Sequence, residues 1–164
     1  MSRAFVREGD GDGPDDLPEL PLSPHPNYVT PRGLHLLQER LQAVEQQRAG
    51  IDEAELGAVQ QRALLARELR WLQARIGGAL LVPTPAQPPA QVVFGAVVEL
   101  LDDTGKEWRY QIVGEDEADP EQGYVSWLSP LARAIEGRPV GDEVKWPRPA
   151  GDLMVEILAI KTGA

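Results

Sequence analysis

Between residues 31 and 76, apolar side chains recur every three or four positions, the spacing of helices that bury one narrow stripe. The first stripe consists of Leu34, Leu37, Leu41 and Val44. Thr30 before Pro31 is typical of a helix start, because a threonine hydroxyl caps free N–H groups and proline fits the first turn. Gly50 interrupts the stripe, so a first helix is predicted from residue 31 to about residue 49.

A second stripe follows and consists of Leu65, Leu69, Leu72 and Ile76. Gly77 and Gly78 then end it, as glycine commonly does after a helix. Two stripes separated by a short break predict an antiparallel helical hairpin, a coiled coil with arms of roughly 19 and 23 residues, or about 28 to 35 Å. Because the outer positions are polar, we expect the hairpin to project from the body. The alternative is two helices of an ordinary bundle.

The pattern changes to a period of two after a proline-rich stretch. Four prolines between Val82 and Ala90 exclude a helix and favour a stiff linker. Alternating residues then predict strands over 92–101, 108–112, 123–127, 143–146 and 153–160, with a turn at 102–105 and a short helix over 131–135 capped by Ser129. This order of elements predicts a small antiparallel sheet with one helix, so the fold class is α+β.

Charge and proline content divide the chain further. Residues 1–30 hold two arginines against six acids and five prolines, too little apolar content to repay the entropy of ordering. We therefore expect an acidic, disordered tail over 1–27, the hairpin over 28–80, the linker over 81–90 and the sheet domain over 91–164.

Composition narrows the function classes. The 164 residues carry a net charge of −10 and no cysteine, which excludes a disulfide scaffold, a thiolate zinc site and a cysteine nucleophile. An acidic chain suits a basic protein partner better than direct contact with nucleic acid. No apolar run suggests a membrane span or a secretory signal, so a cytoplasmic protein is expected. His25 and His35 are isolated, so no metal site is expected in the chain itself.

Several motifs resemble the Gre-type bacterial transcription elongation factors. Tyr28–Gly33 resembles the start of that family's hairpin, and the sheet domain carries further matches at 94–96, 110–119, 129–134, 137–142 and 149–151. The resemblance covers about residues 28–162. It implies a coiled-coil hairpin joined to an FKBP-like C-terminal domain.

The resemblance also implies a function. Such factors bind RNA polymerase through the C-terminal domain and insert the hairpin into the secondary channel. Acidic residues at the hairpin tip help to position Mg²⁺ and water, and the polymerase then hydrolyses the 3′ end of a backtracked RNA. The chain is accordingly not expected to be an enzyme by itself, nor to carry a cofactor, and we expect a monomer that meets nucleic acid only within the elongation complex.

The tip is where this sequence departs from the family pattern. Its midpoint carries Asp52, Glu53 and Glu55 without the expected asparagine and aromatic residue, and each arm is shorter by roughly two turns, or about 11 Å. The three carboxylates are candidates for a catalytic tip. The alternatives are a non-catalytic acidic probe and, as the favoured interpretation, a charge cluster at the start of the second helix, where acids suit the helix dipole.

Two surfaces of the sheet domain are candidates for contacts. Ser129, Pro130, Leu131 and Arg133 match the family motif at the polymerase-binding surface. The acidic stretch Glu115–Asp119 is expected to be a solvated turn rather than a contact with a basic rim. Two other functions remain open: a peptidyl-prolyl isomerase with a pocket formed by aromatic residues, and a non-catalytic coiled-coil interaction module. The isomerase pocket would have to come from Trp108, Tyr110, Tyr124 and Trp127.

Overall fold

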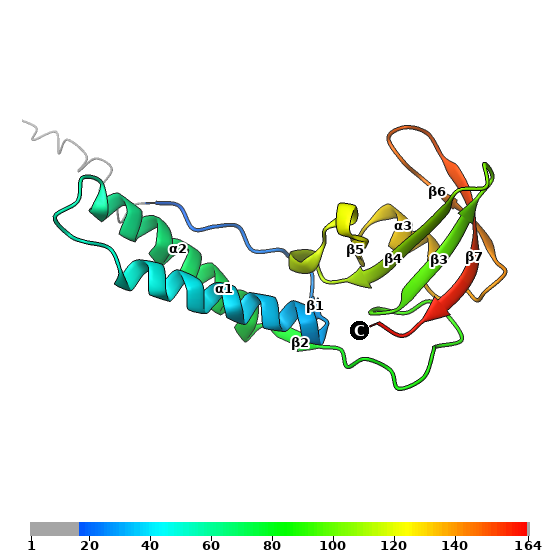
Figure 1. Ribbon diagram of the computed structural model, residues 1–164, viewed down its shortest axis with the longest axis horizontal. Coiled ribbons are helices and arrows are strands. Elements are labelled where there is room, and N and C mark those ends of the chain that lie inside the picture. Colours follow the sequence, from blue (N-terminus) through cyan, green and yellow to red (C-terminus); the bar gives the residue numbers. More distant parts are fainter. Residues whose placement is uncertain (1–16, 164) are drawn as a thin grey trace, which may run out of the picture.

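The computed structural model describes residues 17–163 and shows two parts, a helical hairpin and a β-sheet domain (Figure 1). The hairpin stands to one side of the sheet, and its closed end points away from the domain. The prediction of an α+β protein is confirmed. In the described part of the chain, neither long helix is apolar enough to cross a membrane.

The hairpin consists of α1 (Pro31–Ala49) and α2 (Ala58–Gly77). Thr30 caps α1, since its hydroxyl accepts a hydrogen bond from the N–H of Gly33 at 2.9 Å. All eight residues of the two predicted stripes pack together between the helices, which confirms the antiparallel pair. Arg40 of α1 also binds Glu68 of α2, with 2.7 Å between Nε and Oε1. The second helix has 20 residues. It is shorter than the predicted arm of roughly 23 residues because it begins only at Ala58.

A two-stranded parallel sheet closes the base of the hairpin. Strands β1 (Asn27–Val29) and β2 (Ala79–Leu81) pair in register, and the N–H of Val82 donates to the carbonyl oxygen of Val29 at 2.9 Å. The sequence analysis missed this sheet, because three residues are too few to display a period of two. The pairing holds the two ends of the hairpin together just before the chain enters the proline-rich stretch.

Residues 17–26 lie in extended conformation beside α2 (Figure 1). Glu19 forms an ion pair with Arg70, with 2.7 Å between Oε1 and Nη2. The indole Nε1 of Trp71 donates to the carbonyl oxygen of Pro21 at 3.1 Å. The expected disorder of the N-terminal tail is therefore wrong for residues 17–26, since the side chains of α2 supply partners for its backbone; residues 1–16 lie outside the described residues.

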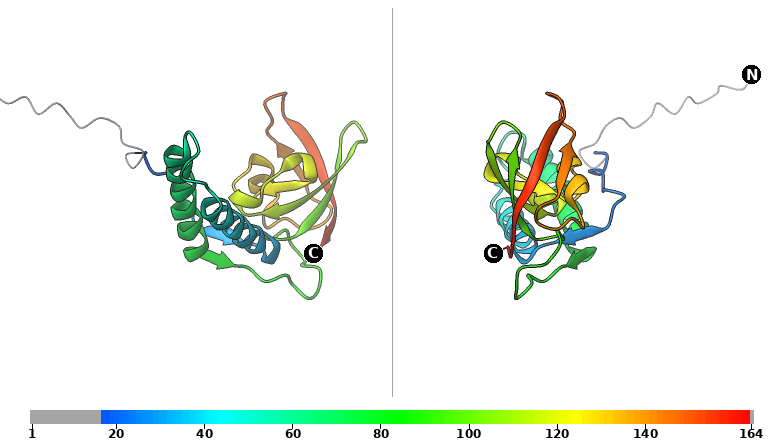
Figure 2. Two further views of the ribbon diagram at one scale, coloured as in Figure 1. Left: turned by 60° about the vertical axis from the view of Figure 1, so that its left-hand side comes forward. Right: turned by 90° about the vertical axis from the view of Figure 1, so that its right-hand side faces the viewer.

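The domain is a curled five-stranded sheet (Figure 2). Its strands have the order β5-β4-β3-β7-β6. Its strands are β3 (Val97–Asp102), β4 (Glu107–Val113), β5 (Tyr124–Ser126), β6 (Glu143–Trp146) and β7 (Leu153–Lys161). Helix α3 (Pro130–Ile135) packs against β6 and β5. Leu100, Ile135 and Ile157 are fully buried between the sheet and this helix. The expectation of a purely antiparallel sheet is wrong, because β4 and β5 run parallel.

Two short 3-10 helices make that parallel pairing possible, since a parallel neighbour needs a crossover connection. They are η2 (Glu115–Glu117) and η3 (Pro120–Gln122). A second difference concerns the first strand, which begins at Val97 and not near Val92. Gly95 has a φ of 86°, a conformation that breaks an extended strand and favours glycine.

Candidate functional site

The hairpin tip is the loop of residues 51–57, and all three candidate carboxylates lie on it, exposed to solvent. Asp52 accepts a hydrogen bond from the N–H of Ala54 at 2.9 Å between Oδ1 and N. Glu53 pairs with Arg62 of α2, with 2.8 Å between Oε1 and Nη1. All three side chains are exposed, but only Glu53 has an ion pair within the described part of the chain. Asp52 and Glu55 have none there.

The favoured interpretation of these acids as a cluster on the second helix is wrong. The first turn of α2 contains no acidic residue, and Gly57, with a φ of 82°, separates the loop from the helix. Across residues 17–163, no three acidic or histidine side chains gather in a group that would hold a metal ion. The tip thus presents separate carboxylates, beside a fully exposed Leu56.

The second candidate surface surrounds α3. The Ser129 hydroxyl accepts from the N–H of Ala132 at 3.2 Å and so caps the helix. Pro130 and Arg133 are exposed, and the Arg133 side chain makes no hydrogen bond or ion pair with the residues that the structure describes. Leu131 is only 2% exposed and belongs to the domain core, so its assignment to a contact surface is wrong.

Further residues missed by the sequence analysis complete this surface. A shallow depression beside Pro130 and Arg133 is lined also by Leu128, Ala134, Lys145 and Pro147. Lys145 comes from β6, which packs against α3. Two cationic side chains therefore flank an apolar floor, and one of them, Lys145, also lies 3.6 Å from Asp152 Oδ2. The arrangement suits a partner with acidic and apolar groups.

The acidic stretch after β4 is a solvated turn only in part, because Asp119 is exposed whereas other members contact the hairpin. Glu117 is buried: its Oε1 accepts from the Thr30 hydroxyl at 2.5 Å, and its Oε2 pairs with Arg32 Nη1 at 2.8 Å. The carboxylate sits at the N-terminal end of α1, where the helix dipole favours negative charge. The expectation of a solvated turn is thus wrong for Glu117, because the helix start supplies the donors and the cation that this carboxylate needs.

Asp116 in the same stretch binds the end of α2. Arg75 is only 5% exposed; its Nε lies 2.6 Å from Asp116 Oδ2, and its Nη2 donates to Asn27 Oδ1 at 2.8 Å. A buried guanidinium requires such partners. Asp116 and Glu117 thus attach the acidic stretch of the domain to the base of the hairpin, by ion pairs with Arg75 and Arg32.

The four aromatic residues named for an isomerase pocket fall into separate groups, although Tyr110 and Tyr124 both line one surface depression. Trp108 and Tyr110 stack on each other at 6.2 Å between ring centroids, and Trp146 packs edge-on against both. The Tyr124 ring lies under Arg32, and Trp127 contacts Tyr28 at the junction of hairpin and domain. Burial raises the pKa of the Tyr110 hydroxyl. Within residues 17–163, the four side chains therefore do not line the one common pocket that the alternative isomerase function would need.

Comparisons with known proteins agree with the motifs. The family model described as transcription elongation factor, GreA/GreB, C-term, matches residues 87–162. The transcription elongation factor GreA of Thioalkalivibrio sulfidiphilus is 42% identical over 106 residues, 63% of this chain and 67% of the relative. The transcription elongation factor GreB of Neisseria meningitidis serogroup B is 36% identical over 152 residues, 82% of this chain and 93% of the relative.

A solved structure is also similar, that of a prokaryotic transcription elongation factor GreA/GreB from Nitrosomonas europaea. It is 23% identical, and the match covers 82% of this chain and 98% of that one with a TM-score of 0.41.

Proposed function

The chain belongs to the GreA/GreB family of transcription elongation factors, and from this premise we propose that it binds RNA polymerase and acts on paused or backtracked complexes. Its C-terminal domain grips the polymerase, and its hairpin enters the secondary channel. The hydrolysis of RNA, where it occurs, is performed by the polymerase, with the Mg²⁺ of the polymerase active site. The chain itself is then a monomeric, cytoplasmic regulator without its own cofactor.

The observation that carries this proposal is the placement of the tip. The tip loop lies at the far end of the two helices from the sheet domain (Figure 1), and α1 with 19 residues is about 28 Å long. A narrow, polar hairpin of this length can reach into a channel while the domain stays outside. In finer detail, we propose that the hairpin is a coiled coil and that the domain is FKBP-like.

A rigid base supports the same proposal. The tip is useful as a probe only if the domain fixes its direction, and the ion pairs of Arg32 with Glu117 and of Arg75 with Asp116 join the two parts. Both contacts bury a charged group, so losing either one would strongly destabilise the folded state. The hairpin is therefore held against the domain and does not swing freely on the proline-rich stretch.

The exposed side of α3 is the proposed polymerase contact, and Arg133 tests it. The Arg133→Glu variant is expected to weaken binding to core polymerase roughly tenfold, the effect of losing about 1.4 kcal/mol of interaction. The affinity is measured by titrating core polymerase with labelled protein. Arg138→Glu serves as the control, since Arg138 is also exposed but lies beyond α3, where it pairs with Asp142 at 3.4 Å between Nη1 and Oδ2. Equal affinity of wild type and Arg133→Glu would exclude this surface, and no binding by the wild type would exclude the function.

A further inference from the structure

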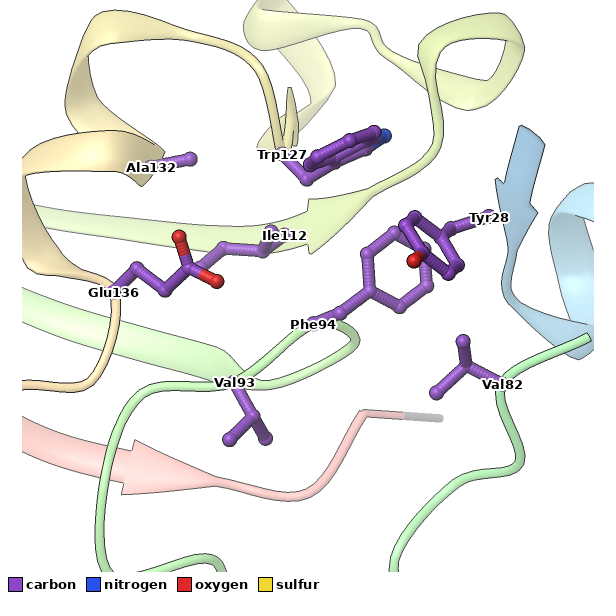
Figure 3. Close-up of a pocket in the computed structure, with 8 residues that line it drawn as sticks. All are labelled: Tyr28, Val82, Val93, Phe94, Ile112, Trp127, Ala132 and Glu136. Atoms are coloured by element: carbon purple, nitrogen blue, oxygen red, sulfur yellow. The ribbon is translucent and has the colours of Figure 1, made fainter. Parts of the chain in front are cut away.

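A pocket of about 290 Å³ lies where the base of the hairpin meets the sheet domain (Figure 3). Three of its lining residues are aromatic: Tyr28 from β1, Phe94 before β3, and Trp127 after β5. Val93 and Ile112 add aliphatic surface. The pocket is thus built from segments far apart in the sequence and exists only while the hairpin is docked.

The aromatic walls are held in place by one another. The Tyr28 ring lies 5.1 Å from the Trp127 ring, at an interplanar angle of 77°, and 6.0 Å from the Phe94 ring. The first contact is edge-to-face and the second is tilted, at 52°, and edge-to-face contacts are favourable and directional. The walls are therefore in position before any ligand enters.

Glu136 is the one charged side chain among the residues that line the pocket. It follows α3 directly, and its carboxylate stands on the opposite side of the pocket from Tyr28 and Phe94 (Figure 3). The Glu136 carboxylate makes no hydrogen bond or ion pair with any residue between 17 and 163, and the side chain is exposed. It is thus free to receive a cation from outside.

Size and chemistry define what fits. Pockets that enclose whole small molecules measure about 300–1,000 Å³, so this one suits a single side chain. Aromatic faces attract cations, and the carbon stem of lysine or arginine packs well on apolar walls. The net charge of −10 further favours a basic partner.

We propose that this pocket receives the side chain of one basic residue, a lysine or an arginine, presented by the protein partner. The stem packs against the aromatic walls, and the charged head pairs with Glu136. The identification of that partner as RNA polymerase rests on the function proposed above. The pocket then forms a second contact on the domain, on the hairpin side of α3, separate from Pro130 and Arg133.

The pocket is tested first on the full chain alone, with N-acetyl-lysine methylamide as the probe. The norleucine analogue has the same chain without the ammonium group and is the matched probe. We expect the lysine probe to shift the Trp127 indole N–H signal saturably, with about fivefold tighter binding than the norleucine probe. Glu136→Gln is expected to remove most of this preference, because the ammonium group loses the carboxylate with which it pairs, and the exposed Glu121→Gln to retain it. Equal responses to both probes, or no saturable shift, would overturn the proposal.

The partner is tested by titrating core polymerase with the same variants. We expect Glu136→Gln to bind several-fold more weakly than the wild type and Glu121→Gln to bind equally well. Equal binding by Glu136→Gln would overturn the assignment of the basic residue to the polymerase. Failure of the wild type to bind would instead refute the proposed function, and the probe titration would still decide whether the pocket accepts a cation.

Discussion

The carbonyl oxygen of Tyr28 occupies the place where a side chain at position 114 would begin. A Cβ atom on Gly114 would lie 2.3 Å from that oxygen, far inside van der Waals contact. Tyr28 belongs to the base of the hairpin, and Gly114 directly follows β4. The glycine therefore permits the close approach that brings the hairpin onto the domain.

Replacing Gly114 by alanine is expected to push β1 away from the domain. Overpacking of this kind costs about 1–3 kcal/mol of the free energy of unfolding, which corresponds to a melting temperature lower by roughly 2–4 °C per kcal/mol. Gly77→Ala is the matched control, because a Cβ atom at Gly77 meets nothing within 4 Å. Thermal unfolding of both variants measures the difference, and a Gly114→Ala variant as stable as Gly77→Ala would contradict the close approach.

The pair of Arg75 and Asp116 is expected to dominate the stability of the junction. Arg75→Met leaves Asp116 and Asn27 without their buried partner, and breaking such a pair costs about 3 kcal/mol, the lower end of the usual range, since Asp116 keeps some contact with water. The exposed pair of Arg62 and Glu53 gives the control, because Arg62→Met should cost less than about 1 kcal/mol.

Denaturant unfolding measures both variants, and also Asp116→Asn and the double variant Arg75→Met with Asp116→Asn. If the two residues act together, the double variant loses less stability than the two single variants lose in sum. Purely additive losses would show that the two side chains do not interact in solution.

The helices were predictable from the sequence because their stripes are local. Leu34 to Val44 and Leu65 to Ile76 repeat every three or four residues, and each repeat lies within one element. The junction was not predictable in this way. Arg32 binds Glu117, 85 residues away, and Arg75 binds Asp116, 41 residues away. A run of acids by itself resembles a solvated turn, and only the fold shows which cations meet it.

In the candidate site, too, local features are predictable from the sequence, whereas contacts between side chains are not. The position of the tip loop follows from the break between the two stripes, so its carboxylates were found. The pairing of Glu53 with Arg62 was missed, although they are only nine residues apart, because the loop that joins them has no regular period. Leu131 was misplaced because a motif that matches a family surface does not separate exposed positions from buried ones, and on a helix of six residues both occur.

The tip carboxylates are expected to differ in their effect on RNA cleavage. The charge of Glu53 is balanced by Arg62, whereas Asp52 has no cation beside it in the described residues. Asp52→Ala should therefore reduce cleavage in a backtracked polymerase complex by roughly tenfold or more, and Glu53→Ala should reduce it less. The length of the labelled RNA is the measurement. Tight binding of the wild type without any shortening would contradict a cleavage role and make the hairpin a non-cleaving occupant of the channel.

Asp102 is expected to make the sheet domain sensitive to acid. Its carboxylate accepts hydrogen bonds from the Thr104 hydroxyl at 2.6 Å and from Trp108 Nε1 at 3.0 Å, and from the backbone N–H groups of Thr104 and Lys106. These bonds, with that of Thr104 first, hold the pKa of Asp102 well below its ordinary value of 3.8. The ionised form is thus favoured in the folded state.

The direction of the pH effect follows from linkage. Because the folded-state pKa is lowered, the stabilisation is complete above the ordinary value of 3.8 and is lost as the pH falls below it toward the lower folded value. Asp102→Asn should therefore be less stable than the wild type near neutral pH, and the difference should shrink below about pH 4. Urea unfolding followed by tryptophan fluorescence measures this, since Trp108 reports on the turn.

Glu99→Gln is the control for this prediction. The Glu99 carboxylate also has a lowered pKa, from its hydrogen bond to Lys161, but it lies partly in solvent, where such pairs contribute little. A difference between wild type and Asp102→Asn that stays constant from neutral pH to about pH 3 would show that the charge of Asp102 is not what the turn requires. The shape of the asparagine side chain, which retains an acceptor oxygen, would then have to account for the loss.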